Sequence, residues 1–117
     1  MFMAAHTIIY SKQAEEVRAF LRDVLELDSI DIGGGWLIFA LPPAELAVHP
    51  DEGATRHELY LMCEDIETTV QRLKAKGVEL AQPVTDQRWG LVTAIRLPDG
   101  SELGVYQPKH ATAFKAT

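Results

Sequence analysis

Hydrophobic residues recur with a helical period in two segments of the chain. The first stripe, between residues 17 and 25, follows the i, i+3, i+4, i+7 and i+8 spacing that places side chains on one face of a helix. The second stripe spans residues 66–73. Asp65 can cap the start of this helix, and Gly77 can end it. The pattern therefore predicts two amphipathic helices.

Apolar and partly β-branched runs before and after these helices predict strands. They cover residues 6–11, 36–41 and 45–49 around the first helix, and residues 58–63, 91–97 and 102–106 around the second. Gly33 to Gly35, Pro42-Pro43 and Pro98-Asp99-Gly100 provide the turns. These runs account for three strands around each helix. We expect the order strand, helix, strand, strand, strand twice, with one further strand in each unit that the runs do not locate.

A short internal repeat supports this duplication. Residues 45–50, with the sequence Glu-Leu-Ala-Val-His-Pro, return as Glu-Leu-Gly-Val-Tyr-Gln-Pro at residues 102–108. We predict an α+β fold with a single domain over residues 1–117, made of two βαβββ modules at about residues 4–50 and 56–108. Because one helix cannot cover both faces of a four-stranded sheet, the bare faces are expected to curl into a mixed sheet around a shared cavity.

Composition and charge narrow the class of partner. The chain has 117 residues with 47% hydrophobic and 24% charged residues, which is typical of a globular domain. Its formal charge of −6 repels phosphate backbones and anionic lipids, so neither nucleic acid nor a membrane is expected as a partner. Cys63 is the single cysteine and has no disulfide partner within the chain. The start of the chain lacks the basic region of a signal peptide, which favours a cytoplasmic location.

Alternation along the strands predicts which side chains line the cavity, because neighbouring residues of a strand point to opposite faces. One face of each strand is aliphatic or small and suits packing under a helix. The other face mixes His, Glu, Tyr and Met, which is typical of a cavity with a few placed polar groups. We expect a small organic ligand there, and both His6 and Glu58 lie on this face. The predicted substrate-binding wall consists of Tyr10, Trp36, His49, Tyr60, Met62 and Tyr106.

Several motifs resemble those of the vicinal oxygen chelate superfamily, which includes glyoxalase I, bleomycin-resistance and fosfomycin-resistance proteins and extradiol dioxygenases. They are His6-Thr7-Ile8-Ile9-Tyr10, the helix with Phe20-Leu21-Arg22-Asp23-Val24-Leu25, Glu64-Asp65-Ile66, and Leu97-Pro98-Asp99-Gly100-Ser101-Glu102-Leu103. The resemblance extends from His6 to Pro108 and implies a glyoxalase-like fold. It does not select an activity, because the same fold hosts isomerases, dioxygenases, transferases and binding proteins. The function expected from the resemblance is that of a glyoxalase/bleomycin-resistance-like protein that binds a small organic molecule, with His6 and Glu58 as the catalytic pair that orients the ligand or moves a proton.

The resemblance also implies where a metal would bind. Metal enzymes of the superfamily place four ligands, commonly His or Glu, on the first and last strands of the two modules. The matching positions here are His6, Ala47, Glu58 and Gly104, and two of these residues have no ligating side chain. Catalytic zinc and non-haem iron sites use three protein ligands. No metal residue and no cofactor is therefore predicted.

Other readings stay open at this point. His6, His49 and Glu58 could form a displaced two-histidine, one-carboxylate site for a divalent metal, in a lyase, isomerase or dioxygenase. A one-residue bulge in the strand would turn His57 instead of Glu58 toward the cavity. A binding protein without turnover is a third reading. Glu58 could also be held in a salt bridge by an arginine. Bare sheet edges favour a homodimer, and the cavity could form within one chain or between two.

Overall fold

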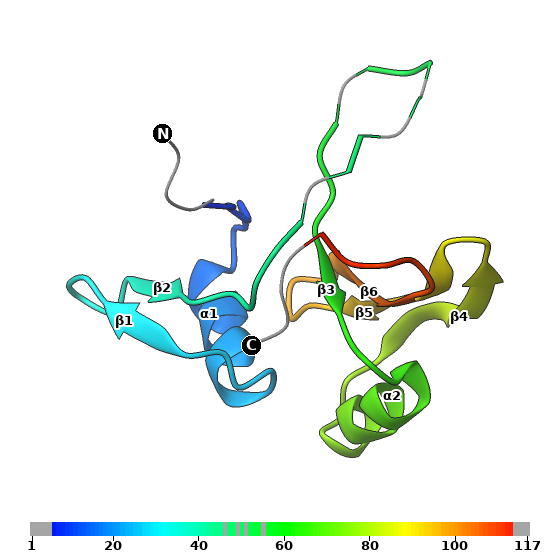
Figure 1. Cartoon of the computed structure of the whole chain (residues 1–117). Coiled ribbons are helices and arrows are strands. Elements are labelled where there is room, and N and C mark those ends of the chain that lie inside the picture. Colours follow the sequence, from blue (N-terminus) through cyan, green and yellow to red (C-terminus); the bar gives the residue numbers. More distant parts are fainter. Residues whose placement is uncertain (1–5, 46, 49, 51, 55, 114–117) are drawn as a thin grey trace.

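The computed structural model describes residues 6–45, 47, 48, 50, 52–54 and 56–113 of the chain. Its elements in order are α1 (Ala14–Asp23), β1 (Ser29–Asp31), β2 (Leu37–Phe39), β3 (Tyr60–Met62), α2 (Ile66–Ala75), β4 (Leu80–Gln87), β5 (Gly90–Arg96) and β6 (Glu102–Pro108). The predicted α+β class is confirmed: the chain forms a mixed sheet that is curled but not closed (Figure 1). None of the described helices is long and apolar enough to cross a lipid bilayer.

The main sheet has four strands in the order β3-β6-β5-β4. β3 runs parallel to β6, whereas β6 with β5 and β5 with β4 are antiparallel pairs. One row of the sheet joins Tyr60 to Gly104, Gly104 to Ala94, and Ala94 to Gln82. β1 and β2 form a separate two-stranded antiparallel sheet. The row from Tyr60 to Gln82 crosses the whole main sheet and carries the candidate site.

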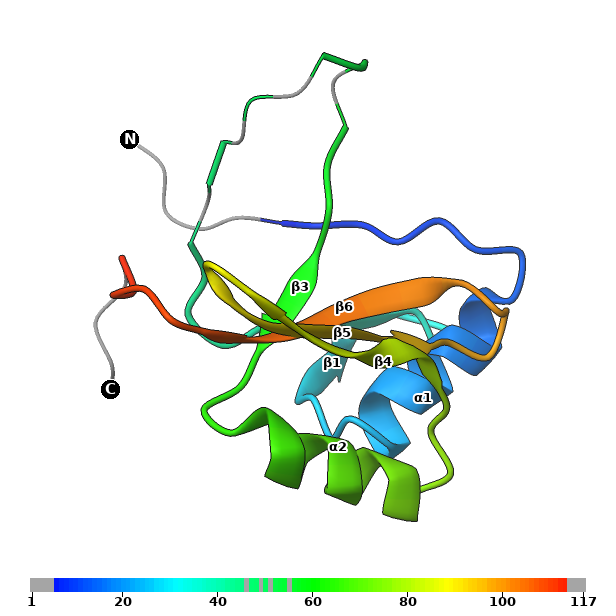
Figure 2. The same ribbon diagram turned by 90° about the vertical axis from the view of Figure 1, so that its right-hand side faces the viewer.

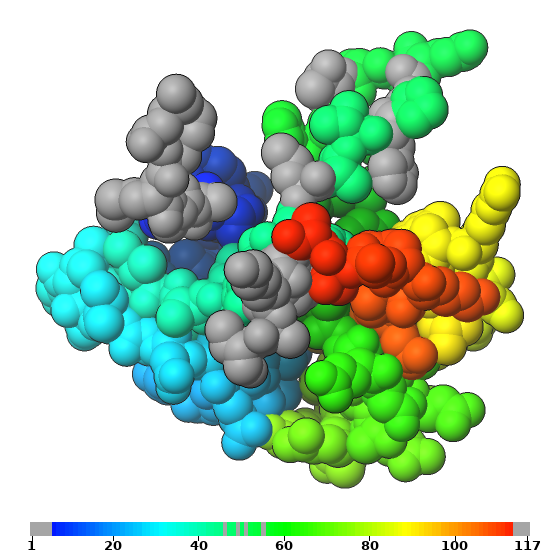
Figure 3. Space-filling model, in the orientation of Figure 1, coloured from blue at the N-terminus to red at the C-terminus, as the bar shows by residue number. Residues whose placement is uncertain are grey.

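Both described helices lie on one side of the main sheet, and residues 6–13, which precede α1, lie on the other side (Figure 2). Val17 of α1 and Leu73 of α2 join Ile95, Leu103 and Val105 of the sheet in one buried cluster. Ile95 is completely buried within it. Since these sheet residues alternate with those of the opposite face, one face is committed to the core and the other is free to line a site. Figure 3 shows the N-terminal part, in blue and cyan, beside the C-terminal part, in green to red.

The helix boundaries follow local signals in the sequence. The side chain of Asp65 accepts a hydrogen bond from the backbone N–H of Glu67 at 3.2 Å, as an N-cap does. α2 ends before Gly77, whose φ of 82° is accessible to glycine at little cost. α1 has no side-chain hydrogen bond at its Gln13 cap. Its position instead depends on packing, because Val17 is buried against the sheet.

The strands predicted at both ends of the first module are wrong. Residues 6–11 belong to neither sheet, and Glu45, Ala47 and Val48 are not in a strand either, while Leu46 and His49 lie outside the described residues. A strand requires a backbone ladder, and alternation alone does not supply one. These segments are held by side chains: the Ser11 hydroxyl donates to the Asp99 carboxylate, and the Glu45 carboxylate accepts from the Ala113 N–H at 2.9 Å.

β4 is an edge strand that the hydrophobic pattern did not predict. It contains Pro83, which has no N–H to donate, and its register with β5 shifts on both sides of Gln82. The buried Thr93 hydroxyl donates to the Gln82 carbonyl at 2.8 Å in this irregular stretch. Such bulges bend and twist a strand, so they contribute to the curl of the main sheet.

Candidate functional site

A hollow of about 590 Å³ lies between the segment that precedes α1 and the face of the main sheet opposite the helices. Residues 7–10 border it on one side and residues 57–60 on another. β4, β5 and β6 contribute the floor, including Gln82, Ala94 and Gly104. This volume lies within the range of sites for small organic molecules.

The floor of the hollow carries small residues where Gly104 of β6 pairs with Ala94 of β5. Tyr60 lies next to Gly104 in the same row. A Cβ atom added at Gly104 would lie 2.3 Å and 2.5 Å from the Cδ1 and Cε1 atoms of the Tyr60 ring. Ordinary contacts of a Cβ begin near 3.4 Å. The Tyr60 ring therefore occupies the space that any side chain at position 104 would need.

Glu58 holds the outer end of Tyr60. The Tyr60 hydroxyl donates to Glu58 Oε2 at 2.9 Å, and Arg56 Nε donates to Glu58 Oε1 at 3.4 Å. Burial of the phenol, followed by the hydrogen bond and the negative charge of Glu58, raises the pKa of Tyr60 above its ordinary value. The salt bridge expected as one alternative for Glu58 is thus present, with Arg56 as the partner.

Tyr60, Trp89 and Tyr106 form an aromatic cluster beside the hollow. Their ring centroids are 5.4–6.2 Å apart, and each pair meets edge to face. The Tyr106 hydroxyl donates to Glu45 Oε1 at 3.3 Å and lies 3.3 Å from His110 Nε2. Burial, together with the charge of Glu45, raises the pKa of Tyr106. Of the three rings, only Tyr60 borders the hollow itself.

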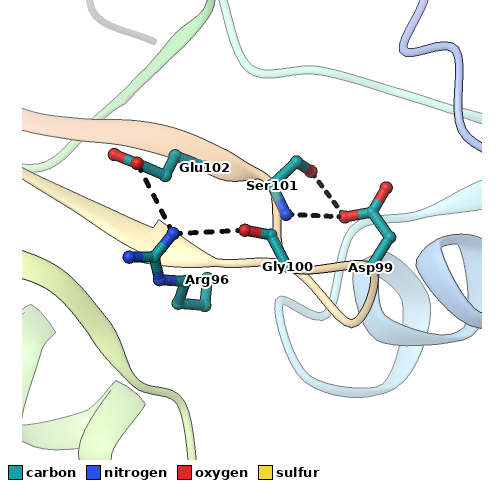
Figure 4. Close-up of polar contacts among 5 residues, drawn as sticks. All are labelled: Arg96, Asp99, Gly100, Ser101 and Glu102. Carbon is teal, nitrogen blue, oxygen red and sulfur yellow. Dashed lines mark hydrogen bonds and ion pairs between the residues drawn. The ribbon is translucent and has the colours of Figure 1, made fainter.

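The turn between β5 and β6 borders the hollow through Leu97, Ser101 and Glu102. Figure 4 shows the polar contacts within this turn. Asp99 accepts from the hydroxyl and the N–H of Ser101 at 2.5 and 3.0 Å. The Ser101 hydroxyl, the Ser11 hydroxyl and then the Ser101 N–H lower the pKa of Asp99 to about 2. Arg96 donates to the Gly100 carbonyl at 3.2 Å. The contact with Ser11 ties the start of α1, and with it the segment over the hollow, to this turn.

The structure brings together only part of the predicted site. Tyr10, Glu58 and Tyr60 line the hollow. His6 is exposed and precedes the lining segment, and neither Met62 nor Tyr106 borders the hollow. Trp36 lies at the β1–β2 hairpin, with the Arg18 guanidinium 4.6 Å from its ring centroid, and His49 lies outside the described residues. Of the predicted catalytic pair His6 and Glu58, only Glu58 therefore borders the hollow.

Residues of the hollow that the sequence did not single out are mostly small or neutral. Gln82, Ala94 and Ser101 carry no chemical signal that separates them from other strand and turn residues. Glu45 did appear in the internal repeat, but its contact with Tyr106 joins residues 61 positions apart. The contact between Glu45 and Tyr106 is therefore visible only in the tertiary structure.

The described residues do not fit the four-ligand metal site that the resemblance implies. Gly104 offers no ligand, and the Tyr60 ring fills the space above it. Glu58 is already engaged by Tyr60 and Arg56. Across the part of the chain that the structure describes, no cluster of three or more His, Cys, Asp and Glu side chains is arranged to hold a metal ion.

Several solved structures share this fold. TnmS3, an antibiotic binding protein from Streptomyces sp. CB03234, is 24% identical with a TM-score of 0.64, over 92% of this chain and 100% of that one. Lactoylglutathione lyase from Agrobacterium tumefaciens is 18% identical with a TM-score of 0.63, over 86% and 90%. A member of the Glyoxalase/bleomycin resistance protein/dioxygenase superfamily from Sphaerobacter thermophilus DSM 20745 is 20% identical with a TM-score of 0.61, over 92% and 97%.

Sequence comparison places the chain in a family. A search of curated protein sequences finds no significant match. The profile of the family described as Glyoxalase/Bleomycin resistance protein/Dioxygenase superfamily matches residues 4–105. Since this match covers most of the chain, and the fold is that of structures from the same group, the chain belongs to the Glyoxalase/Bleomycin resistance protein/Dioxygenase superfamily.

Proposed function

We propose that this chain binds a small organic molecule in the hollow and does so without the complete metal site of its superfamily. The observation that carries the proposal is the pairing of Tyr60 with Gly104, which puts an aromatic ring where a metal ligand would project. TnmS3, which shares the fold, is named as an antibiotic binding protein, and this is the kind of function proposed here.

The lining supports a ligand that is partly apolar and donates hydrogen bonds. Val92, Ala94 and the Tyr60 ring provide apolar surface, while the carboxylate of Glu58 and the amide of Gln82 provide acceptors. Glu58 would orient the ligand or accept a proton from it. His6 stays a candidate partner for this step, at the outer end of the segment that borders the hollow.

A homodimer in the cytoplasm is part of the proposal. Ile8, Tyr10 and Val48, which belong to the segments that do not join either sheet, are 58%, 88% and 89% exposed. Burying such apolar side chains is favourable, and a second copy of the chain would provide the partner surface. Light scattering or sedimentation of the purified protein tests this part of the proposal, and a monomer at micromolar concentration would contradict it.

Metal analysis of the protein purified without a histidine tag tests the central claim. We expect substoichiometric Fe, Ni, Zn and Mn, together with a rise in Tm on adding bleomycin or members of a panel of phenols and aromatic amines. Ala94→Phe should abolish the rise because it fills the floor of the hollow, whereas Ile32→Ala, at an exposed residue away from the hollow, should preserve it. Stoichiometric metal would instead support a lyase, isomerase or dioxygenase that uses His6, His49 and Glu58.

A further inference from the structure

The Tyr60 ring is held in one orientation by three contacts. Its hydroxyl donates to Glu58 at 2.9 Å. Its ring plane meets Trp89 at 81° and Tyr106 at 87°, with centroid distances of 6.2 and 5.6 Å. A ring fixed at its tip and packed at its edges by two other rings has little freedom to rotate. It presents a rigid surface to the hollow.

The row beyond Gly104 leaves space beside the Tyr60 ring. Gly104 and Ala94 follow Tyr60 in the same row of the sheet, and Gln82 ends the row. Because the ring covers Gly104, the small side chain of Ala94 separates the ring from the next long side chain. Tyr60 is the large aromatic residue in this row, and the other two rings of the cluster do not border the hollow. Along this row, Tyr60 is thus the side chain that limits the shape of a ligand that the hollow can accept.

We propose that Tyr60 is the specificity-determining residue of the hollow, and that it selects ligands with a flat, unsaturated ring system over compact aliphatic ligands of similar size. This inference rests on the proposed function. A planar ligand can lie over Ala94, beside the Tyr60 ring that covers Gly104, and meet that ring in an offset or edge-to-face contact. A globular ligand of equal volume makes contact with the ring over a smaller area. Gly104 is needed for this position of the Tyr60 ring, because any side chain at residue 104 would displace the ring.

Two matched probes test the proposal: 2-naphthol, which is planar, and 1-adamantanol, which is globular, with the same number of carbon atoms and one hydroxyl each. Kd values come from NMR titrations that follow the methyl signals of Val92, Thr93 and Ala94, all of which border the hollow. The variants are Tyr60→Leu, which removes the flat ring, and Tyr60→Phe, which keeps the ring without the hydroxyl. Ile32→Ala serves as the control away from the hollow.

We expect the unmodified protein to prefer 2-naphthol, and Tyr60→Leu to weaken 2-naphthol binding by about tenfold, as the loss of one aromatic contact predicts. Tyr60→Phe should stay within about twofold of the unmodified protein, because it keeps the ring. Dispersed methyl signals of Val92, Thr93 and Ala94 in the Leu variant show that this variant is folded. If Tyr60→Leu binds 2-naphthol as well as the unmodified protein while the hollow signals still respond, the role of Tyr60 is refuted and ligand binding stands. If neither probe shifts those signals in any variant, the proposed function fails as well.

Discussion

Gly104→Ala tests the geometry on which the candidate site depends. The new Cβ would lie 2.3–2.9 Å from three atoms of the Tyr60 ring, against an ordinary contact distance of 3.4 Å or more. Forcing a methyl group into a filled space costs about 1–3 kcal/mol. Replacing glycine by alanine within a strand returns about 0.5–1 kcal/mol. The net effect is a loss of up to about 2.5 kcal/mol in the free energy of unfolding.

The same substitution should have the opposite sign when Tyr60 is absent. In a Tyr60→Ala background the ring no longer occupies the space, so Gly104→Ala should stabilise the protein by about 0.5–1 kcal/mol. The coupling free energy between the two positions is then about 1–3 kcal/mol, well above the scatter of independent sites.

Urea unfolding followed by tryptophan fluorescence measures both effects. With a slope of about 1–3 kcal/mol per M, the shift of the midpoint caused by Gly104→Ala should differ between the two backgrounds by on the order of 1 M. Gly77→Ala is the control, because its cost comes from a backbone φ of 82° with no atom within 4 Å of the added Cβ, and this cost should be the same in both backgrounds. Equal shifts for Gly104→Ala with and without Tyr60 would refute the interlocked arrangement.

Three further predictions concern the turn, the phenol and the core. Asp99 has a folded-state pKa of about 2, below its ordinary 3.8, so its contribution to stability is present above pH 3.8 and is lost as the pH falls through 2. Asp99→Asn should therefore flatten the dependence of Tm on pH across this window, and an unchanged profile would argue against the bonds from Ser101 and Ser11. Glu58→Gln should lower the pKa of Tyr60 toward 10, as followed by NMR titration of that ring, because it removes a negative charge and a strong acceptor from the phenol. Ile95→Ala should cost about 2–5 kcal/mol in urea unfolding, against less than about 0.5 kcal/mol for the exposed Ile30→Ala; similar costs would place Ile95 outside the core.

Local patterns predicted the elements whose stability is largely local or that pack against a single buried face. α2 is an example, because its apolar stripe, the Asp65 cap and Gly77 all lie within residues 65–77. The turn at residues 98–100 is another, since Asp99 and Ser101 hold each other across two positions. In such cases the interacting groups are neighbours in the chain, so their spacing is enough to predict the contact.

The edges of the first module show where this reasoning fails. Alternation at residues 6–11 predicted a strand, yet this segment joins neither sheet, and Ser11 instead bonds Asp99. β4 was missed because its hydrophobic pattern is weak, although it pairs with β5 along most of its length. A strand exists only if another segment offers a backbone ladder, and that partner is chosen by the fold as a whole.

The sequence by itself determined the α+β class, the two amphipathic helices, the negative net charge, and the absence of ligating side chains at Ala47 and Gly104. Only the tertiary structure decided what takes their place. It brought Tyr60 over Gly104 and Glu58 against the Tyr60 hydroxyl, while it placed Trp36 away from the hollow. The reason is physical: a missing side chain can be seen in a sequence, but which ring fills the resulting space depends on the register between strands that are about 40 residues apart.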